Sequence, residues 1–406
     1  MGSGVEGGAG RAAAARGGRG AGATPTGAGR ARRRRRRWLW GAAAGVAAAA
    51  MGAGVVGTVL YAKLSANITA DEAAAAELAR YEKERPTVLV KGARNILLIG
   101  SDSRAGAENG RYGRDPGTER SDTTILLHLD ARRRSATAVS LPRDLMVHVP
   151  GCRTPDGTRT GPAFAMLNRA FQAGGSACAV RTVEKLTGVR IDHHVVVDFS
   201  GFKDLVDAVD GVEVCLARPV DDKAAKLRLP AGRVTLDGEQ ALGFVRARKS
   251  LGDGSDTERM DRQQRFLGAL VNKLRGNDVL LNPVKLYPVL DAATSSLTTD
   301  PGLASLRGLY DLVRAVRDVP TEQVRFLTVP RESYVYDPNR DQLAEPAAEE
   351  LFRRLRTDAP IEVRADSTPG PRGDGRAGDP AAATSPPGTP FRGRTAAEDP
   401  CGKSSG

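Results

Sequence analysis

Short apolar runs alternate with amphipathic stretches through the middle of the chain. Residues 95–100 and 123–129 are apolar runs of strand length, whereas residues 256–275 repeat apolar side chains three and four positions apart, which is typical of a helix. The other predicted strands are 136–141, 191–199, 211–216 and 324–329, and the other predicted helices are 176–187, 202–210 and 301–317. The pattern predicts an α/β fold, a layered αβα domain with a central mixed sheet.

An uncharged segment of 23 residues, 38–60, precedes this region. At about 1.5 Å rise per residue it is long enough to cross a hydrocarbon core of roughly 30 Å. The apolar part of a cleaved signal peptide is usually shorter. We therefore expect a single transmembrane helix over residues 38–62, with a cleaved signal as the alternative.

The positive charge of the chain is concentrated before this segment. The formal net charge is +12, and residues 1–37 hold ten Arg against the single acid Glu6. By the positive-inside rule the N-terminus is cytoplasmic and the rest extracytoplasmic, so the protein is expected in the cell membrane as a single-pass protein. A nucleic-acid-binding arm is the alternative, and we expect no nucleic acid partner because the hydrophobic segment follows directly.

Composition divides the remainder of the chain. Residues 63–86 are rich in Ala, Glu and Lys and predict a helical stem. Residues 87–365 have the composition of one globular, extracytoplasmic catalytic domain. Residues 366–406 are rich in Pro and Gly and are predicted to be disordered, like the basic tail 1–37.

Four cysteines occur in a chain expected to face an oxidising environment. Cys152 lies in a loop and Cys178 near the start of a predicted helix, so this pair is the favoured disulfide, with a structural role. Cys215 is predicted to be a buried strand residue, and Cys401 lies in the C-terminal tail. Their spacing does not match that of metal ligands.

Several common catalytic motifs are absent from the sequence. It has no GxSxG, Walker or HExxH motif. His193 and His194 are adjacent in a predicted strand and would point to opposite faces, so they are poor joint metal ligands.

Charged residues instead follow or precede three predicted strands. Asp102 follows the first, Arg120 and Asp122 precede the second, and Arg143 and Asp144 follow the third. Ligands of open α/β sheets bind at such strand ends. Two carboxylates, Asp102 and Asp122, suggest Mg²⁺, and arginines beside them suit phosphate oxygens. The alternative is that these are ordinary surface charges.

A second charged cluster lies near the predicted long helix. In an extended segment Arg246 and Arg248 would point the same way, whereas in a helix they would diverge. On the helix, Arg259, Gln263 and Phe266 share one face. The apolar stripe beside them is more often core than lipid pocket.

The motifs NILLIGSDSR, RSDTTILL, SLPRDLMV, LDGEQALGFVRAR and RMDRQQ resemble, in order, those of the LytR–CpsA–Psr family over roughly residues 92–275. The resemblance implies transfer of a cell-wall glycopolymer from a polyprenyl-pyrophosphate carrier to peptidoglycan at the membrane, with Mg²⁺. It also assigns residues to roles. Metal ligands would be Asp102 and Asp122. Pyrophosphate would be bound by Arg120, Arg143, Arg246, Arg248, Arg259 and Gln263. The catalytic set would be Arg120, Asp122, Arg143, Arg246 and Arg248, to which the position of Asp256, one turn before Arg259, adds a candidate base. The polyprenyl chain would contact Val195, Val197, Phe199, Phe202, Phe266 and Leu270.

Alternatives to this function remain open. A polyprenyl-pyrophosphate hydrolase would use water as the acceptor in the same site, and a non-enzymatic envelope regulator or scaffold would need no such set of charges. Asp256 is a candidate base for the acceptor hydroxyl, or simply the cap of a helix. The polymer, the polyprenyl length and the oligomeric state are not predicted.

Overall fold

The computed structural model describes residues 28–101, 121–154, 156–223, 225, 227–247, 256–276, 283–364 and 390–398. The chain divides into two units, Met1–Tyr61 and Ala62–Gly406. The first unit consists, in its described part, of helix α1 (Ala28–Asn67), which continues into the second. Among the described residues one helical stretch, Arg33–Asn67, is long and apolar enough to cross a membrane.

The second unit is built from the following elements. Its helices are α2 (Glu72–Arg80), α3 (Asn168–Thr187), α4 (Phe199–Ala208), α5 (Gly238–Arg246), α6 (Asp256–Arg275), α8 (Pro283–Ser296), α9 (Leu306–Arg317) and α10 (Ala347–Thr357). Its main-sheet strands are β1 (Thr69–Ala70), β2 (Arg94–Ser101), β3 (Ser121–Leu129), β4 (Ala136–Leu141), β7 (His193–Val197), β12 (Leu297–Thr299), β13 (Val324–Thr328), β16 (Val363–Arg364) and β17 (Phe391–Thr395). Its paired short strands are β5 (Met146–Val149) with β6 (Ala163–Met166), β8 (Val212–Leu216) with β11 (Gly232–Leu236), β9 (Val220–Asp222) with β10 (Leu227–Leu229), and β14 (Arg331–Tyr334) with β15 (Asp337–Leu343).

Within the described residues, nine strands form one mixed sheet in the order β1-β12-β7-β2-β3-β4-β13-β17-β16. Strand β2 is parallel to β7 and antiparallel to β3, and β4 is antiparallel to β3 and parallel to β13. The α/β class with a central mixed sheet, predicted from the hydrophobic pattern, is confirmed.

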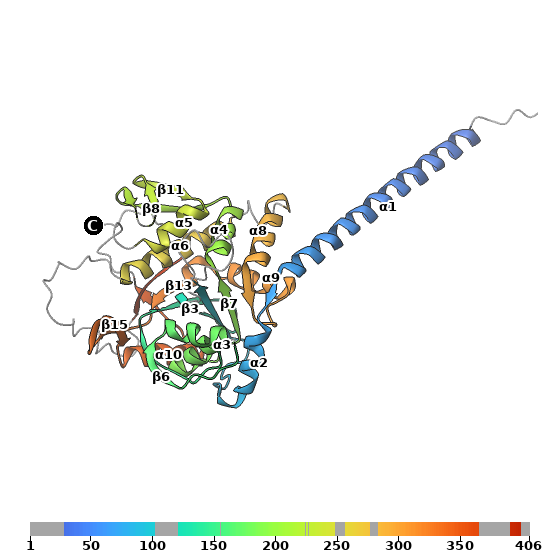
Figure 1. The fold of residues 1–406 in the computed structure, drawn as a ribbon. Helices are drawn as coiled ribbons and strands as arrows, with labels where there is room; N and C mark the ends of the chain where they lie inside the picture. Colours follow the sequence, from blue (N-terminus) through green and yellow to red (C-terminus); the bar gives the residue numbers. More distant parts are fainter. Residues whose placement is uncertain are drawn as a thin grey trace, which may run out of the picture. The chain divides into compact units, whose positions relative to one another are not determined.

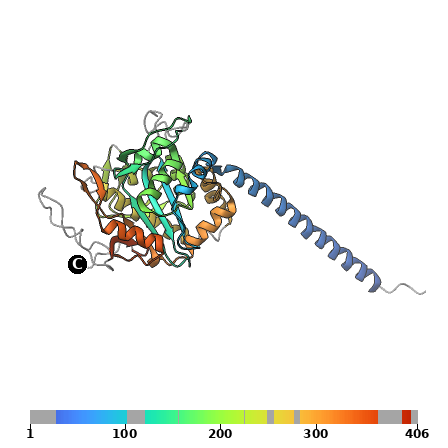
Figure 2. The same ribbon diagram turned by 90° about the horizontal axis from the view of Figure 1, so that it is seen from below.

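Different helices cover the two faces of the sheet (Figure 1), and apolar side chains of each face pack against them. On one face Leu97 and Val139 lie in a core cluster with residues of α3 and α10. Figure 2 looks onto this face, which α3 (green) and α10 (red) cover. On the other face Ile96 and Val195 pack with α6 and α9. The domain therefore has the predicted αβα layers.

Helix α6 is buried on two sides because it separates the sheet from a further small layer. Leu267 and Val271 pack toward the sheet cluster. Phe266, fully buried, belongs instead to a cluster formed with α4, α5, β8 and β11. This explains why α6 carries apolar residues over a wide stripe.

The predicted disulfide between Cys152 and Cys178 is present, with a Cα–Cα distance of 5.7 Å. It lies beside a kink in α3 at Gly174 and Gly175. A Cβ on Gly174 would come within 3.0 Å of the Cβ atoms of both cysteines, and Gly175 has φ +59°. The glycines therefore allow the chain to turn closely around the disulfide.

Three expectations about individual segments need correction. Residues 63–86 are only partly helical: they include β1, which pairs with β12, and α2, whose Leu78 lies in the main core. Residues 391–395, predicted to be disordered, form β17 and pair with β13. Cys215 is half-buried rather than buried, because Val214 and Leu216 face the core on the other side of β8.

Candidate active site

Five neighbouring strands of the main sheet each have one end along the same edge of the sheet, by which we mean the line formed by the strand ends. Strands β2, β4, β7 and β13 all end there, and β3 begins there, since Ser101 pairs with Ser121 and Thr124 with Leu141. The arrangement follows from the parallel and antiparallel pairings alone. It brings residues that are distant in sequence to one place.

Asp122 and Arg143 meet across this edge. Arg143 Nη1 donates to Asp122 Oδ1 at 2.8 Å, and Arg143 Nε donates to Asp144 Oδ2 at 3.2 Å. The side chain of Asp122 is 36% exposed and that of Arg143 20%. The ion pair is therefore accessible to a ligand, and the guanidinium is fixed by two carboxylates.

The first turns of α6 lie over the same edge. Gln263 Nε2 donates to Thr123 Oγ1 at 3.3 Å and to Val245 O at 3.4 Å, so it joins β3 to α5. Gln264 Nε2 donates to Ser140 Oγ at 3.1 Å and to Thr328 Oγ1 at 3.0 Å. The start of α6 is thus attached to three strands of the sheet.

Two buried arginines accompany these glutamines on α6. Arg259 and Arg262 are both buried, as is Phe266 farther along the same face. Arg262 donates to the carbonyl of Ala247, and burial lowers its pKa although Glu258 and Asp261 oppose this effect. Arginine is not deprotonated in proteins, so Arg262 keeps its positive charge although burial lowers its pKa. The helix therefore carries two buried positive charges in the turns just before Gln263, which contacts Thr123.

Arg246 is the last residue of α5, not part of an extended segment. Of the two alternatives left open for residues 244–248, the helical one holds for Phe244 and Arg246. A capping box between Asp237 and Gln240 starts this helix, and Ala247 leaves it with φ −53° and ψ 136°. The Arg246 guanidinium lies 4.4 Å from the centroid of the Phe199 ring, a cation–π distance that fixes the side chain at the end of β7.

Sequence reasoning missed Arg331, which lies at the same edge. It follows β13, and its guanidinium contacts the Asp341 carboxylate and the Thr257 hydroxyl of α6. The signal was present: Pro142-Arg143-Asp144 after β4 is repeated by Pro330-Arg331-Glu332 after the parallel strand β13.

The second unit, Ala62–Gly406, contains nearly all of the residues that match a known protein family. A family model described as the LytR_cpsA_psr family matches residues 60–357. The chain belongs to the LytR_cpsA_psr family. The resemblance first seen in the motifs is thereby confirmed.

Relatives in this family include the probable cell wall biosynthesis protein LcpB of Corynebacterium glutamicum. It is 37% identical over 271 residues, which are 64% of this chain and 61% of LcpB. TagT of Bacillus subtilis, a polyisoprenyl-teichoic acid–peptidoglycan teichoic acid transferase, is 27% identical over 73% of this chain and 88% of its own length. The chain thus spans about three fifths of the length of LcpB.

A solved structure shares the fold. The LytR-Csp2A-Psr enzyme from Actinomyces oris superposes with a TM-score of 0.52 at 22% identity, covering 67% of this chain and 93% of that one. At this identity the likeness concerns the fold alone.

Some residues assigned by family resemblance lie outside the described residues. These are Asp102, Arg120 and Arg248. Asp256 begins α6, but its side chain is also outside the described part. The remaining assigned residues, four charged side chains and the neutral amide of Gln263, are Asp122, Arg143, Arg246, Arg259 and Gln263, and they lie on or next to the elements that meet at the edge.

The six residues assigned to the polyprenyl chain do not form one cluster in this LytR_cpsA_psr member. Val195 and Val197 belong to the cluster between the sheet and α6. Phe202, Phe266 and Leu270 belong to the cluster on the far side of α6, where the Phe202 and Phe266 rings are 5.4 Å apart. Phe199 packs instead against Arg246.

The adjacent histidines face opposite sides of β7, as predicted. His193 Nδ1 lies 3.1 Å from Asp300 Oδ1, and His194 Nε2 lies 3.3 Å from Asp71 Oδ2. In the described part of the chain, no group of three or more His, Cys, Asp or Glu side chains is placed to hold a metal ion.

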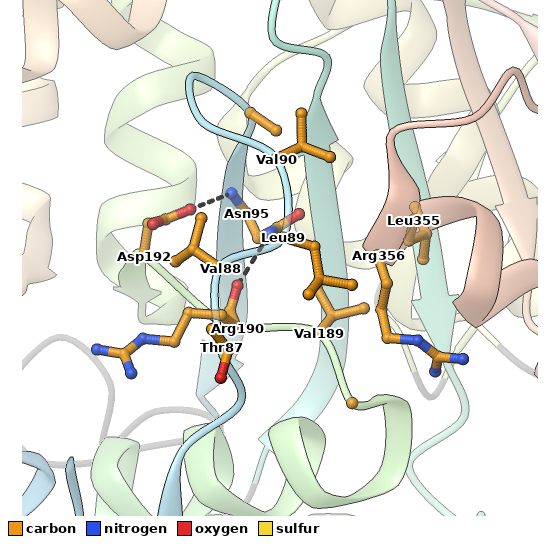
Figure 3. A pocket seen from close by; sticks show the side chains of 12 residues that line it. Thr87, Val88, Leu89, Val90, Asn95, Val189, Arg190, Asp192, Leu355 and Arg356 are labelled. Carbon is orange, nitrogen blue, oxygen red and sulfur yellow. Dashed lines mark hydrogen bonds between the residues drawn. The ribbon is translucent and has the colours of Figure 1, made fainter. Parts of the chain in front are cut away.

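A shallow, open depression lies at the other edge of the sheet (Figure 3). Its polar groups are engaged within the protein: Asn95 donates to the Arg190 carbonyl at 2.9 Å, and its backbone N–H donates to Asp192 at 2.8 Å. The start of β2 lines it, whereas the charged site lies at the end of β2. It is therefore separate from the candidate active site.

Proposed function

We propose that this protein transfers a cell-wall glycopolymer from a polyprenyl-pyrophosphate carrier to peptidoglycan, leaving a phosphodiester link. The observation that carries the proposal is the Arg143–Asp122 ion pair at the sheet edge, with Arg246, Arg259 and Gln263 brought to the same edge by α5 and α6. The name of the relative TagT describes a reaction of this type.

The reaction is a phosphoryl transfer. An acceptor hydroxyl oxygen forms a bond to the phosphorus nearest the glycopolymer, the bond from that phosphorus to the bridging oxygen breaks, and polyprenyl phosphate leaves. Catalysis of such a step depends on positioning and on stabilising charge. Arg143 and Arg246 are each fixed by a neighbour, so their guanidinium groups can bind phosphate oxygens without reorganising.

The proton of the acceptor hydroxyl must leave during the attack. Asp256 is the proposed acceptor of this proton, because it is the first residue of α6 and therefore belongs to the turn that also carries Arg259. Its conversion to Asn would remove the base but keep the size of the side chain.

The carboxylate of Asp122 fits a proposed Mg²⁺ requirement. One of its oxygens accepts from Arg143, and the other can face a ligand. Protein Mg²⁺ sites use one or two carboxylates together with substrate phosphates, so Asp122 with Asp102 would hold the ion. Mg²⁺ would supply charge neutralisation on the pyrophosphate. Removal of divalent cations should abolish turnover, and Mg²⁺ should restore it.

We also propose that the second unit is extracytoplasmic. The apolar helix Arg33–Asn67 would anchor the chain in the cytoplasmic membrane, and the ten arginines before Trp38 would keep the N-terminus inside. Protease added to intact cells from which the outer wall layers have been removed should then cleave residues after Ala62 and spare the N-terminus.

The function is tested with the full chain in detergent micelles, supplied with a polyprenyl-pyrophosphate-linked polymer and peptidoglycan. Transfer gives polymer bound to peptidoglycan and one polyprenyl phosphate. Release of polyprenyl phosphate at the same rate without peptidoglycan would instead identify a hydrolase. Retention of near-normal transfer by Arg246→Ala would refute the site.

A further inference from the structure

Four aromatic rings form a continuous row on the surface of two hairpins. His148 of β5 and Phe164 of β6 are opposite each other, with ring centroids 4.9 Å apart. Phe164 lies 6.0 Å from Tyr334 at the end of β14, and Tyr334 lies 5.4 Å from Tyr336 in the turn that follows. The hairpins are separated by more than 160 residues of chain, so folding alone brings these rings together.

The row is exposed to solvent. Phe164 is 48% exposed, Tyr336 84% and its neighbour Val335 72%. Single exposed apolar side chains are common, but a contiguous exposed group marks an interaction surface. Neighbouring rings are tilted by 54°, 52° and 63° to one another, so the row offers a partner several separate ring faces and not one flat surface.

The row is close to the candidate active site. Strand β5 begins two residues after Asp144, and β14 begins with Arg331. From Arg331 to Tyr334 the strand covers roughly 10 Å. The two hairpins are joined: Asp341 N donates to Asp144 O at 3.3 Å, and Arg340 of β15 contacts Met166 of β6.

We infer that this aromatic row binds the glycan strand of the peptidoglycan acceptor. A pyranose ring has an apolar face of C–H groups that packs on an aromatic face, and the spacing of the four rings is about the length of one sugar unit in an extended chain. The inference rests on the proposed transferase function and adds a binding site for the second substrate.

The acceptor fits the row better than the donor does. The arginines at the sheet edge suit the phosphate groups by which the donor is held. The row offers aromatic faces instead, which suit a chain of sugars without phosphate. A glycan bound along the row would have its neighbouring units within reach of Arg143 and Asp122, where the acceptor hydroxyl is needed.

The test uses the full chain in detergent micelles and the double variant Phe164→Ser/Tyr336→Ser. Both positions are exposed, so the variant should fold, which its unchanged thermal unfolding would show. The conservative variant Phe164→Tyr/Tyr336→Phe keeps both rings. Tyr310→Ser, which removes a 60% exposed ring from α9, is the matched control.

Binding to isolated peptidoglycan and the transfer kinetics are measured for each variant. We expect the serine variant to lose peptidoglycan binding and to raise the KM for soluble peptidoglycan fragments about tenfold or more, with the donor KM and kcat unchanged. The two control variants should match the wild type.

An unchanged acceptor KM would overturn the inference, and so would a rise in the donor KM alone, which would assign the row to the polymer. An equal effect of Tyr310→Ser would show that the loss is not specific to the row. If the wild type binds peptidoglycan through the row but transfers no polymer, the proposed function fails while the binding site stands.

Discussion

Arg143 and Asp122 are joined by a hydrogen bond of 2.8 Å between residues at the ends of two antiparallel strands. The bond orients the guanidinium, and Asp144 holds its Nε from the other side. A ligand phosphate would therefore meet an arginine whose geometry is already fixed. Such preorganisation is the main source of charge stabilisation in enzyme sites.

Replacement of Arg143 by Ala should lower the rate of glycopolymer transfer by about a hundredfold or more, because a fixed donor to the transferred phosphoryl group is lost. Arg143→Lys keeps the charge but not the planar pair of donors, so it should recover only part of the rate. The measurement is product formation at saturating donor. Arg169→Ala, at an exposed position on α3, is the control and should behave as the wild type. Equal rates for Arg143→Ala and this control would contradict the role.

Arg331 should act as a positioning residue for the start of α6. It bridges the Asp341 carboxylate and the Thr257 hydroxyl, and the following turns of α6 carry Arg259 and Gln263. Loss of the bridge in Arg331→Ala should reduce kcat roughly tenfold to a hundredfold through misplacement of these side chains, with a small change in donor KM.

Thr257→Val is the matched test of the same bridge. It removes only the hydroxyl that contacts Arg331, so its effect on kcat should be smaller than that of Arg331→Ala. A large effect on donor KM in Arg331→Ala, with kcat preserved, would show that Arg331 binds substrate directly and does not position α6.

The sequence allowed prediction of the αβα layers and of the meeting of Asp122 with Arg143, because both depend on local signals. Apolar runs mark the strands, and charged residues stand directly at their ends. The sequence left open whether Arg246 lies in a helix or in an extended segment, although the capping box of Asp237 with Gln240 is visible in the sequence. The two-residue spacing of Arg246 and Arg248 did not decide between them.

Other features depend on tertiary contacts that no local pattern reveals. Residues 391–395 (Phe-Arg-Gly-Arg-Thr) lack an apolar alternation, and they form β17 because β13 offers a free edge. The division of the predicted lipid-contact residues follows from the position of α6 between two layers. Only the packing of α6 on both sides decides which residue faces which cluster.

The place of β17 in the sheet can be tested through Gly393, which pairs with Leu327. A Cβ at this position would lie 2.4 Å from the Phe326 carbonyl oxygen and 3.0 Å from Val363. Gly393→Ala should therefore destabilise the domain by about 1–3 kcal/mol, as overpacking does. The measurement is the free energy of unfolding in denaturant.

Gly161→Ala is the control for this experiment, because a Cβ there would meet no atom within 4 Å. It should leave the free energy of unfolding unchanged or raise it slightly. If Gly393→Ala were equally neutral, residues 391–395 would not be packed against β13 in solution.

Asp300 should make the stability of the domain depend on pH in the acid range. Burial alone would raise the pKa of its carboxyl, but the hydrogen bond and charge of His193, together with the His194 N–H, hold it below the usual 3.8. The carboxylate also accepts from the Gly302 N–H at 2.9 Å. The folded state therefore binds the proton more weakly than the unfolded state does.

Because the folded pKa is depressed, Asp300 contributes stability that is fully present above pH 3.8 and is lost as the pH falls through the lower, folded value. Asp300→Asn keeps the shape but carries no charge, so it should be less stable than the wild type at neutral pH. The difference in thermal unfolding temperature should then shrink as the pH falls below 3.8. A difference that stayed constant over this range would mean that the loss reflects packing and hydrogen-bond geometry, and that the charge of Asp300 does not stabilise the fold.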